Sequence, residues 1–315
     1  MAKSSKAWLE QFTTDEIREL RAIREHRAWL TLFVDYGLIA ASMALVAYLP
    51  SVFTVVLALF IIGARQLGFA VVMHESAHYT LFKNRKFNDF VGNWLAGYPV
   101  YLSANMYRAH HLEHHAKTWT DGDPDLSLAT AFPVSKASMA RKVMRDLFGI
   151  TGLKKLIGTT YLVIKVIGGE EIDSGTLPMR MEREPAIRML VGTVLTNLIL
   201  FGMLWALGHP LLYLLWFGAW MTTNNLVARI RSIAEHAVVP DPSDPIGQTR
   251  TVRAGWLERL FIAPNCVQYH LEHHLVMTVP HYNLPRFHAM MRERGLLEGA
   301  CVADNYAQVL RVAVA

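Results

Sequence analysis

The feature that most constrains this chain is a set of apolar stretches about as long as a bilayer is thick. Hydrophobic residues make up 52% of the 315 residues. A helix that crosses a bilayer needs about 20 apolar residues, and four segments approach that length, at residues 30–48, 53–73, 187–207 and 211–228. Long buried helices of a soluble enzyme normally keep a polar face, which these segments lack. We therefore predict an all-α membrane protein with four transmembrane helices.

The connections between these segments predict how the helices pair. Only Leu49–Pro50–Ser51 separates the first two segments, and only Gly208–His209–Pro210 separates the last two. Connections this short join antiparallel helices, so we expect two hairpins. Two further apolar runs, Val91–Leu102 and Tyr161–Ile167, are too short to span and are interpreted as interfacial helices or a re-entrant piece.

Positive charge is distributed unevenly along the chain. Of the 31 Lys and Arg residues, six lie in residues 1–28, fourteen in 79–185 and nine in 229–315, whereas neither short connection carries any. Cytoplasmic segments of membrane proteins are enriched in these residues. We therefore expect both termini and the middle region to be cytoplasmic. The net charge of +5 then follows from topology and does not indicate nucleic-acid binding.

The segments outside the apolar stretches are expected to form one structure. We predict a cytoplasmic helical cap, residues 74–186 and 229–315, over the membrane helices, within a single domain of residues 1–315. The polar N-terminal residues contain no apolar core of a cleaved signal peptide. The protein is thus predicted to be an integral, multi-pass membrane protein.

Fourteen histidines are present, and most of them are clustered. The clusters read HESAH, HHLEHH and HLEHH, and a further histidine stands alone in RSIAEHAV. Positions i, i+3 and i+4 are neighbours on a helix, so the rings of each cluster can point to one place. All the clusters lie on the predicted cytoplasmic side. The candidate metal ligands are His74, His78, His111, His114, His115, His236, His270, His273 and His274.

The number of candidate ligands indicates more than one metal. A neutral imidazole offers a nitrogen lone pair that suits iron, zinc, copper and nickel. A zinc ion takes about four protein ligands, or three and a water. Nine imidazoles therefore divide more naturally between two ions that keep positions open for a co-substrate.

Two other classes of protein compete with this interpretation. HESAH also fits the HExxH motif of zinc proteases, in which His74 and His78 bind zinc and Glu75 acts as general base. That motif does not account for two HLEHH segments. A metal transporter would place ionisable residues near the bilayer midplane, where only Arg65 is expected. Arg65 is predicted to pair with Asp35 or to bind a polar group of the substrate.

With these boxes in their contexts, the chain resembles the membrane fatty acid desaturase superfamily. HESAHYTLFKNRKFNDFVGNWLAG, YRAHHLEHHAKTWTDGDPDL and NCVQYHLEHHLVMTVPHYNLPRFH are similar to its three histidine boxes, and the resemblance covers residues 30–295. It implies a non-haem centre of two iron ions held by the nine histidines above, with O₂ as co-substrate. His110 is then expected outside the ligand set. One departure is Ser232, where some acyl-CoA desaturases have an asparagine that helps to complete the site.

The resemblance also implies a reaction class and partners. The expected function is an oxidoreductase that attacks an unactivated C–H bond, most simply a desaturase that introduces a C=C bond into a fatty acyl chain or lipid in the bilayer. A hydroxylase, ketolase or oxidative decarboxylase with the same centre is the alternative. The chain contains no haem-binding HPGG segment, and its two cysteines, Cys266 and Cys301, form no cluster motif. Electrons are therefore expected from a separate ferredoxin, rubredoxin or cytochrome, with its reductase.

Acidic residues accompany the boxes. A carboxylate that accepts the second ring N–H of a ligand histidine fixes the tautomer and raises its basicity. Each acid has solvation or helix capping as its alternative role. His281 and His288 are predicted to belong to the C-terminal part of the cap. The candidate orienting acids are Glu75, Glu113, Glu235, Glu272, Asp121, Asp123 and Asp125.

Overall fold

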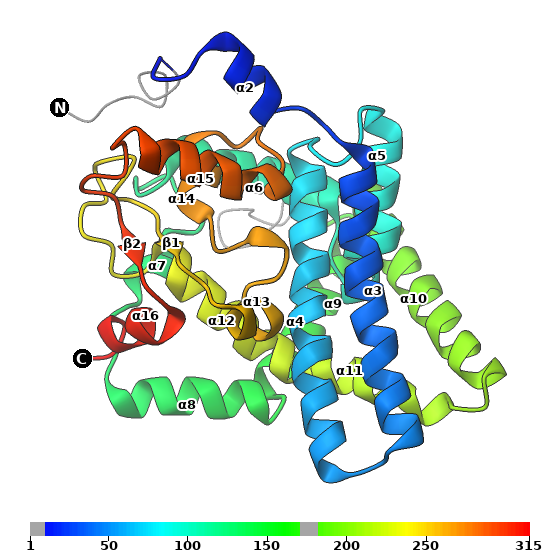
Figure 1. Ribbon diagram of the computed structural model, residues 1–315. Coiled ribbons are helices and arrows are strands. Elements are labelled where there is room, and N and C mark those ends of the chain that lie inside the picture. Colours follow the sequence, from blue (N-terminus) through cyan, green and yellow to red (C-terminus); the bar gives the residue numbers. More distant parts are fainter. Residues whose placement is uncertain (1–9, 171–181) are drawn as a thin grey trace.

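A computed structural model of the protein describes residues 10–170 and 182–315. The predicted all-α class is confirmed, because the described residues are mostly helical and their only sheet is one short parallel pair (Figure 1). The first part contains α2 (Thr14–Leu20), α3 (Glu25–Tyr48), α4 (Val52–Ala77), α5 (Arg85–Val91), the π-helix η1 (Gly92–Gly97), the 3₁₀-helix η2 (Tyr98–Val100), α6 (Ala104–Lys117), α7 (Leu126–Thr130), α8 (Lys136–Leu147) and α9 (Ile150–Ile167). The second part contains α10 (Arg183–Ala206), η4 (Pro210–Leu212), α11 (Tyr213–Met221), α12 (Thr223–His236), β1 (Thr251–Val252), α13 (Trp256–Phe261), η5 (Pro264–Cys266), α14 (His270–Leu275), η6 (His281–Asn283), α15 (Leu284–Glu293), β2 (Val302–Ala303) and α16 (Tyr306–Val312).

Helices α3 and α4 form a long antiparallel pair (Figure 1). The turn between them is short because Pro50 cannot continue α3 and Ser51 caps α4, its hydroxyl accepting a hydrogen bond from the Thr54 N–H at 3.1 Å. Helix α4 continues beyond the predicted apolar segment to Ala77. This extension gives His74 and His78 the helical phase that the first histidine box requires.

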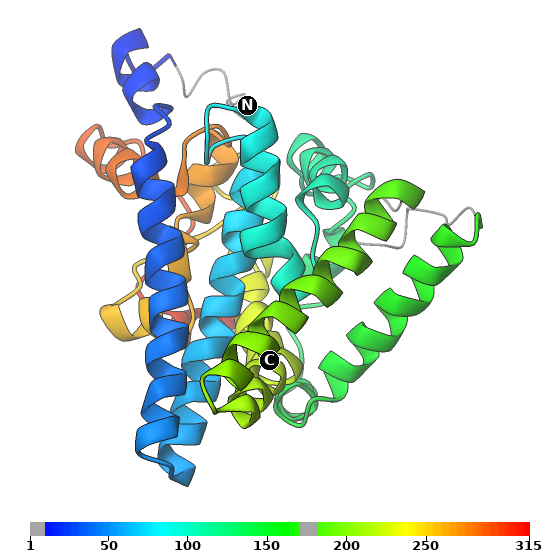
Figure 2. The same cartoon turned by 90° about the vertical axis from the view of Figure 1, so that its right-hand side faces the viewer.

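Three helices among the described residues are long and apolar enough to cross a bilayer. These are α3, α4 and α10, and α8 with α9 would add a fourth if this pair, bent by 68°, is counted as one span. Figure 2 shows α9 and α10 beside one another and inclined to the α3–α4 pair. The run Tyr161–Ile167, predicted to be a short interfacial piece, is the end of the 18-residue α9.

The predicted helix over residues 211–228 is not continuous. It breaks at Thr222, whose φ and ψ are −121° and −90°. Thr222 and Asn225 supply the reason, since the Thr222 hydroxyl donates to the Gly218 carbonyl at 2.6 Å and the Asn225 amide donates to the Trp220 carbonyl at 2.9 Å. Side chains that bond nearby carbonyls compete with the helical hydrogen bonds. The nine residues of α11 extend only about 14 Å, so α11 by itself does not cross a bilayer, and the expectation of one span here is corrected.

The second half of α4 is the centre of the fold. It contacts α6, α11 and α12 as well as α3, so nearly every residue from Ile62 to Ala77 is buried. Gly63 allows the close approach of α12, because a Cβ there would lie 2.3 Å from the Thr223 hydroxyl oxygen. The Thr223 hydroxyl in turn donates to the Leu59 carbonyl. This packing brings the end of α12, and with it His236, beside the end of α4.

Arg65, the one deep charge of the second apolar segment, has partners at both terminal nitrogens of its guanidinium. Its Nη1 lies 3.2 Å from an oxygen of Asp35 on α3, and its Nη2 donates to the carbonyls of Arg259 and Leu260. Asn265 donates to the other Asp35 oxygen at 2.7 Å. The expected structural pair is confirmed, and it connects both long helices to the C-terminal segment that precedes α14.

Candidate metal centre

The nine predicted ligand histidines lie together beside the C-terminal end of α4. They come from four helices that are far apart in sequence. Helix α4 carries His74, and His78 is its C-cap residue. Helix α12 ends at His236. The other two helices carry three each: His111, His114 and His115 on α6, and His270, His273 and His274 on α14. Most of these side chains are buried, so the packing of α6, α12 and α14 beside the end of α4 encloses the cluster.

The cluster divides into two groups. The first, called the five-histidine group, has one ring nitrogen of each member within 4.8 Å of the others: His74, His78, His111, His115 and His273. The second, called the four-histidine group, consists of His114, His236, His270 and His274. In it, His114, His236 and His274 meet the same criterion, and His270 joins through an Nε2–Nε2 distance of 2.9 Å to His236.

The nitrogen geometry fits metal ions. Nε2 of His115 lies 3.0 Å from Nε2 of both His111 and His273. Two imidazole nitrogens at about 2.1 Å from one ion and at right angles to each other are about 3.0 Å apart. Nε2 of His74, His78 and His274 is buried without any hydrogen-bond partner. Buried polar atoms normally have a hydrogen-bond partner. These three nitrogens have none, so their lone pairs are available to bind a metal ion.

Burial favours the neutral form of most of these imidazoles. Desolvation, with repulsion from neighbouring imidazoles, lowers the pKa of His78 and of His236 to about 3. The same causes hold the pKa of His111, His115 and His274 well below the usual range. A neutral imidazole is the form that binds a metal. The site is therefore ready to bind cations at neutral pH without first losing protons.

Some of the acids near the boxes orient the rings as predicted. Asp123 lies 2.7 Å from Nδ1 of His114, and Glu235 lies 3.2 Å from Nδ1 of His270. Although burial opposes it, the hydrogen bond with His114 lowers the pKa of Asp123. Both contacts use Nδ1, which leaves Nε2 free to face the metal position.

Other acids do not act on the ligand rings in this way. Glu113 pairs with Lys117 on the same helix, and Asp121 is exposed. Glu272 contacts Thr251 and His288 instead. Asp121 thus has the alternative role of a solvated acid, whereas Glu113 and Glu272 pair with other side chains, a role that was not among the predicted alternatives.

Glu75 is not placed as the zinc-protease hypothesis requires, and His281 is one of the residues that hold it. One Glu75 oxygen accepts hydrogen bonds from the Thr80 hydroxyl at 2.7 Å and from the His281 backbone N–H at 2.8 Å. The other lies 3.5 Å from Nδ1 of His74. A carboxylate held in this way supports the fold around the ligands, whereas a general base has to face a metal-bound water.

Two contributors were not found from the sequence. The Tyr107 hydroxyl lies 3.0 Å from Nδ1 of His111 and is one helical turn before it, so the i, i+4 spacing was a usable signal. His281 touches Glu75 through the fold alone, and no spacing in the sequence indicated this contact. His110 bonds Asp125 at 3.0 Å and belongs to neither group, as predicted.

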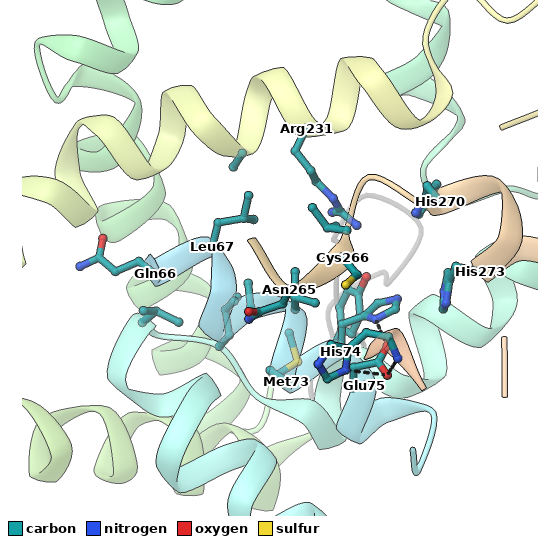
Figure 3. A pocket seen from close by; sticks show the side chains of 18 of the residues that line it. Gln66, Leu67, Met73, His74, Glu75, Arg231, Asn265, Cys266, His270 and His273 are labelled. Atoms are coloured by element: carbon teal, nitrogen blue, oxygen red, sulfur yellow. Dashed lines mark hydrogen bonds and ion pairs between the residues drawn. The ribbon is translucent and has the colours of Figure 1, made fainter. Parts of the chain in front are cut away.

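A small cavity adjoins both histidine groups. Figure 3 shows His74, His270 and His273 on its wall, with Arg231 reaching towards it from α12. Its volume is about 220 Å³. The apolar part of its wall comes mainly from α4 and the segment before α14, with further side chains from α12, α15 and the residues around η2. A molecule held here would lie against both groups of ligands.

Comparison with known proteins agrees with this geometry. Residues 49–303 match the sequence profile of the fatty acid desaturase family, so the chain belongs to that family. The match includes all nine histidines. The protein is therefore a desaturase-family oxidoreductase of membranes, with a buried histidine cluster able to hold metal.

Three relatives show how widely the similarity extends. The dihydrorhizobitoxine desaturase of Bradyrhizobium elkanii is 27% identical over 296 residues, which cover 90% of this chain and 80% of the relative. The sn-1 oleoyl-lipid 12-desaturase of a Synechocystis strain is 23% identical over 85% of this chain and 76% of the relative. The sn-1 acyl-lipid omega-3 desaturase (ferredoxin) of the same strain is 35% identical over 86 residues, 27% of this chain and 24% of the relative.

Proposed function

We propose that this protein is an O₂-dependent desaturase that uses two iron ions to introduce a C=C bond into an alkyl chain. The observation that carries the proposal is the division of nine clustered imidazoles, most of them buried, into two groups whose ring nitrogens lie close together within each group. A donor set made of imidazoles suits iron. When bound, the two irons would supply the oxidising power, with O₂, that removes hydrogen from an unactivated carbon.

The chain's own residues would prepare this chemistry. The five-histidine and four-histidine groups hold the ions, while Asp123, Glu235 and Tyr107 fix the orientation of three ligand rings. The cavity wall positions the alkyl carbon near His74 and His273. Because the cluster is enclosed by α4, α6, α12 and α14, water is kept away from the reacting carbon.

The proposed topology places the metal centre on the cytoplasmic side. All nine ligands lie beside one end of α4, and the segments that carry them are rich in Lys and Arg. The proposed electron donor is a separate ferredoxin, rubredoxin or cytochrome with its reductase. A ferredoxin is consistent with the name of one Synechocystis relative.

The names of the relatives leave the substrate open. One acts on dihydrorhizobitoxine and two act on acyl lipids, by their names. Desaturation is proposed over hydroxylation because the relatives that align over most of the chain are named as desaturases.

The test is expression in a host that lacks the protein, with iron analysis of the purified chain and mass spectrometry of lipids and small acids. The proposal expects bound iron and a product that has lost two hydrogens. A product that has gained one oxygen instead would favour the hydroxylase alternative. A purified chain that binds zinc and no iron would refute the proposed chemistry.

A further inference from the structure

The cavity beside the histidine groups is lined by one cationic side chain that has no carboxylate partner. Apart from histidines, three charged side chains line it: Glu75, Arg231 and Lys155. Glu75 accepts hydrogen bonds from Thr80 and His281, as described above. Arg231 forms an ion pair with Glu235, one turn further along α12. Among the described residues, no carboxylate forms an ion pair with Lys155.

Lys155 is held at the cavity by the packing of α9. One turn earlier on the same helix, Gly152 lies so close to α11 that a Cβ would be 2.3 Å from the Met221 carbonyl oxygen. The Lys155 ammonium lies 5.5 Å from the centre of the Trp220 ring. The Trp220 indole donates to the Val100 carbonyl at 2.9 Å, which fixes the ring. The ammonium is therefore positioned, and it is not a freely moving surface charge.

The Lys155 side chain is half-buried, and an ammonium partly removed from water without a carboxylate partner is costly for the folded protein. Its contact with the face of an indole offsets only part of this cost. Charged groups held in such surroundings within a cavity are concentrated at functional sites. The neighbouring Lys154 is exposed and has no such constraint. The charge without a carboxylate partner at Lys155 thus indicates an anionic ligand group in the cavity.

The dimensions of the cavity limit the rest of the ligand. Its volume of about 220 Å³ is below the range of about 300–1,000 Å³ for pockets that enclose drug-sized ligands. A larger apolar groove of about 770 Å³ lies between α3 and α10. The two share no lining residue. The packed rings of Phe69 and Trp216 line the groove from α4 and α11, so it does not extend the cavity.

We propose that the cavity binds a compact substrate with one carboxylate, and that Lys155 is the residue that binds this carboxylate. The inference rests on the proposed function, since it names the substrate class for the same site. With the carboxylate at Lys155, the short apolar part of the molecule lies along Leu67 and Val71 towards the histidines. A long acyl chain that enters from the bilayer groove is not the expected substrate.

The first test measures binding to the iron-loaded, full-length protein in detergent, without turnover. Hexanoate and hexan-1-ol are the probes, because they differ in the charged group. The variants are Lys155→Met and, as a matched control on the same helix, Lys154→Met. We expect hexanoate to bind wild type and K154M alike, and to bind K155M about tenfold to a hundredfold more weakly. The alcohol should bind all three proteins weakly and equally.

Three outcomes would overturn the inference. Hexanoate and hexan-1-ol could bind wild type equally, K155M could bind hexanoate as well as wild type does, or palmitate could displace hexanoate at lower concentration than hexanoate itself requires. The first two results would show that the charge of Lys155 does not bind the carboxylate. The third would show that the cavity does not limit the length of the ligand. Because binding and iron content are measured separately, loss of iron or absence of a desaturated product would count against the proposed function and not against this inference.

A second measurement separates ligand binding from a structural role. If Lys155 is kept for a ligand, replacing it removes a charge without a carboxylate partner, so ligand-free K155M should unfold at a higher temperature than wild type. Hexanoate should raise the unfolding temperature of wild type and K154M but not of K155M. If K155M unfolds at a lower temperature and hexanoate protects it as well as wild type, Lys155 is a packing residue and the inference is wrong.

Discussion

The two histidine groups differ in the side chains that contact the ring nitrogens not facing the metal position. The five-histidine group has more imidazoles, and its ring contacts beyond the metal position are the neutral Tyr107 hydroxyl and the more distant Glu75 carboxylate. The four-histidine group has one imidazole fewer but two carboxylates closer to its rings, Asp123 and Glu235. A carboxylate on the second ring nitrogen makes an imidazole a stronger donor. If both groups hold metal, as proposed, the smaller number of imidazoles in one group is offset by the greater basicity that the carboxylates give them.

The largest expected effect comes from removing one ligand from each group. His274→Ala leaves three imidazoles in the four-histidine group, whereas His111→Ala leaves four in the other. We expect H274A to lose about half of the bound iron and H111A to lose clearly less, because about four protein ligands suffice to hold an ion. Metal analysis of the purified proteins measures this difference. Equal losses from both variants would show that the groups do not hold ions independently.

The next effect comes from the residues that orient the rings. Asp123→Asn keeps the shape but removes the charge at His114, and we expect its iron affinity to fall about 10–100-fold. Tyr107→Phe removes a neutral contact to His111, worth about 1 kcal/mol, or roughly fivefold. The iron affinity of both variants is measured by competition with a chelator at fixed pH. If Y107F were the more severe variant, the claimed difference between the groups would be wrong.

The two groups should resemble each other in one property, the weak binding of protons by their imidazoles. Burial lowers the pKa of both His78 and His236 from 6.5 to about 3 in the folded protein. As pH falls below 6.5, the unfolded chain takes up protons first, so stability is full above that pH and is lost progressively towards pH 3. Thermal unfolding of metal-free protein should show this loss, and His78→Gln and His236→Gln should each reduce its slope by a similar amount. A flat profile for the wild type between pH 6.5 and 4 would contradict the assignment of buried neutral imidazoles.

The smallest effect is expected for His110, the histidine of the second box that belongs to neither group. His110→Asn should retain the full iron content, because its ring bonds Asp125 and faces no metal position. The loss of that hydrogen bond should lower the free energy of unfolding by about 1 kcal/mol. Iron analysis and denaturant unfolding on the same preparation test both statements. Loss of iron in H110N would extend the ligand set beyond nine.

Helical periodicity explains why so much of the site was predictable. The first box lies on the continuation of α4, and the other two lie on α6 and α14, so i, i+3 and i+4 spacings translate directly into shared faces. Apolar length similarly predicted α3, α4 and α10. It did not predict the break at Thr222, because hydropathy does not register side chains that bond nearby carbonyls.

By itself, the sequence determined that imidazoles would be presented in pairs and triples near the ends of apolar helices, since this depends only on local spacing. Only the tertiary structure decided their partners. His111 and His115 join one group, while His114 between them joins the other, because residues four apart share a face and residue i+3 points to one side of it. In the same way, packing of α9 against α11 turned Lys155 towards the cavity and left Lys154 exposed. Which side chains meet across distant helices depends on how those helices pack, and neither spacing nor composition carries that information.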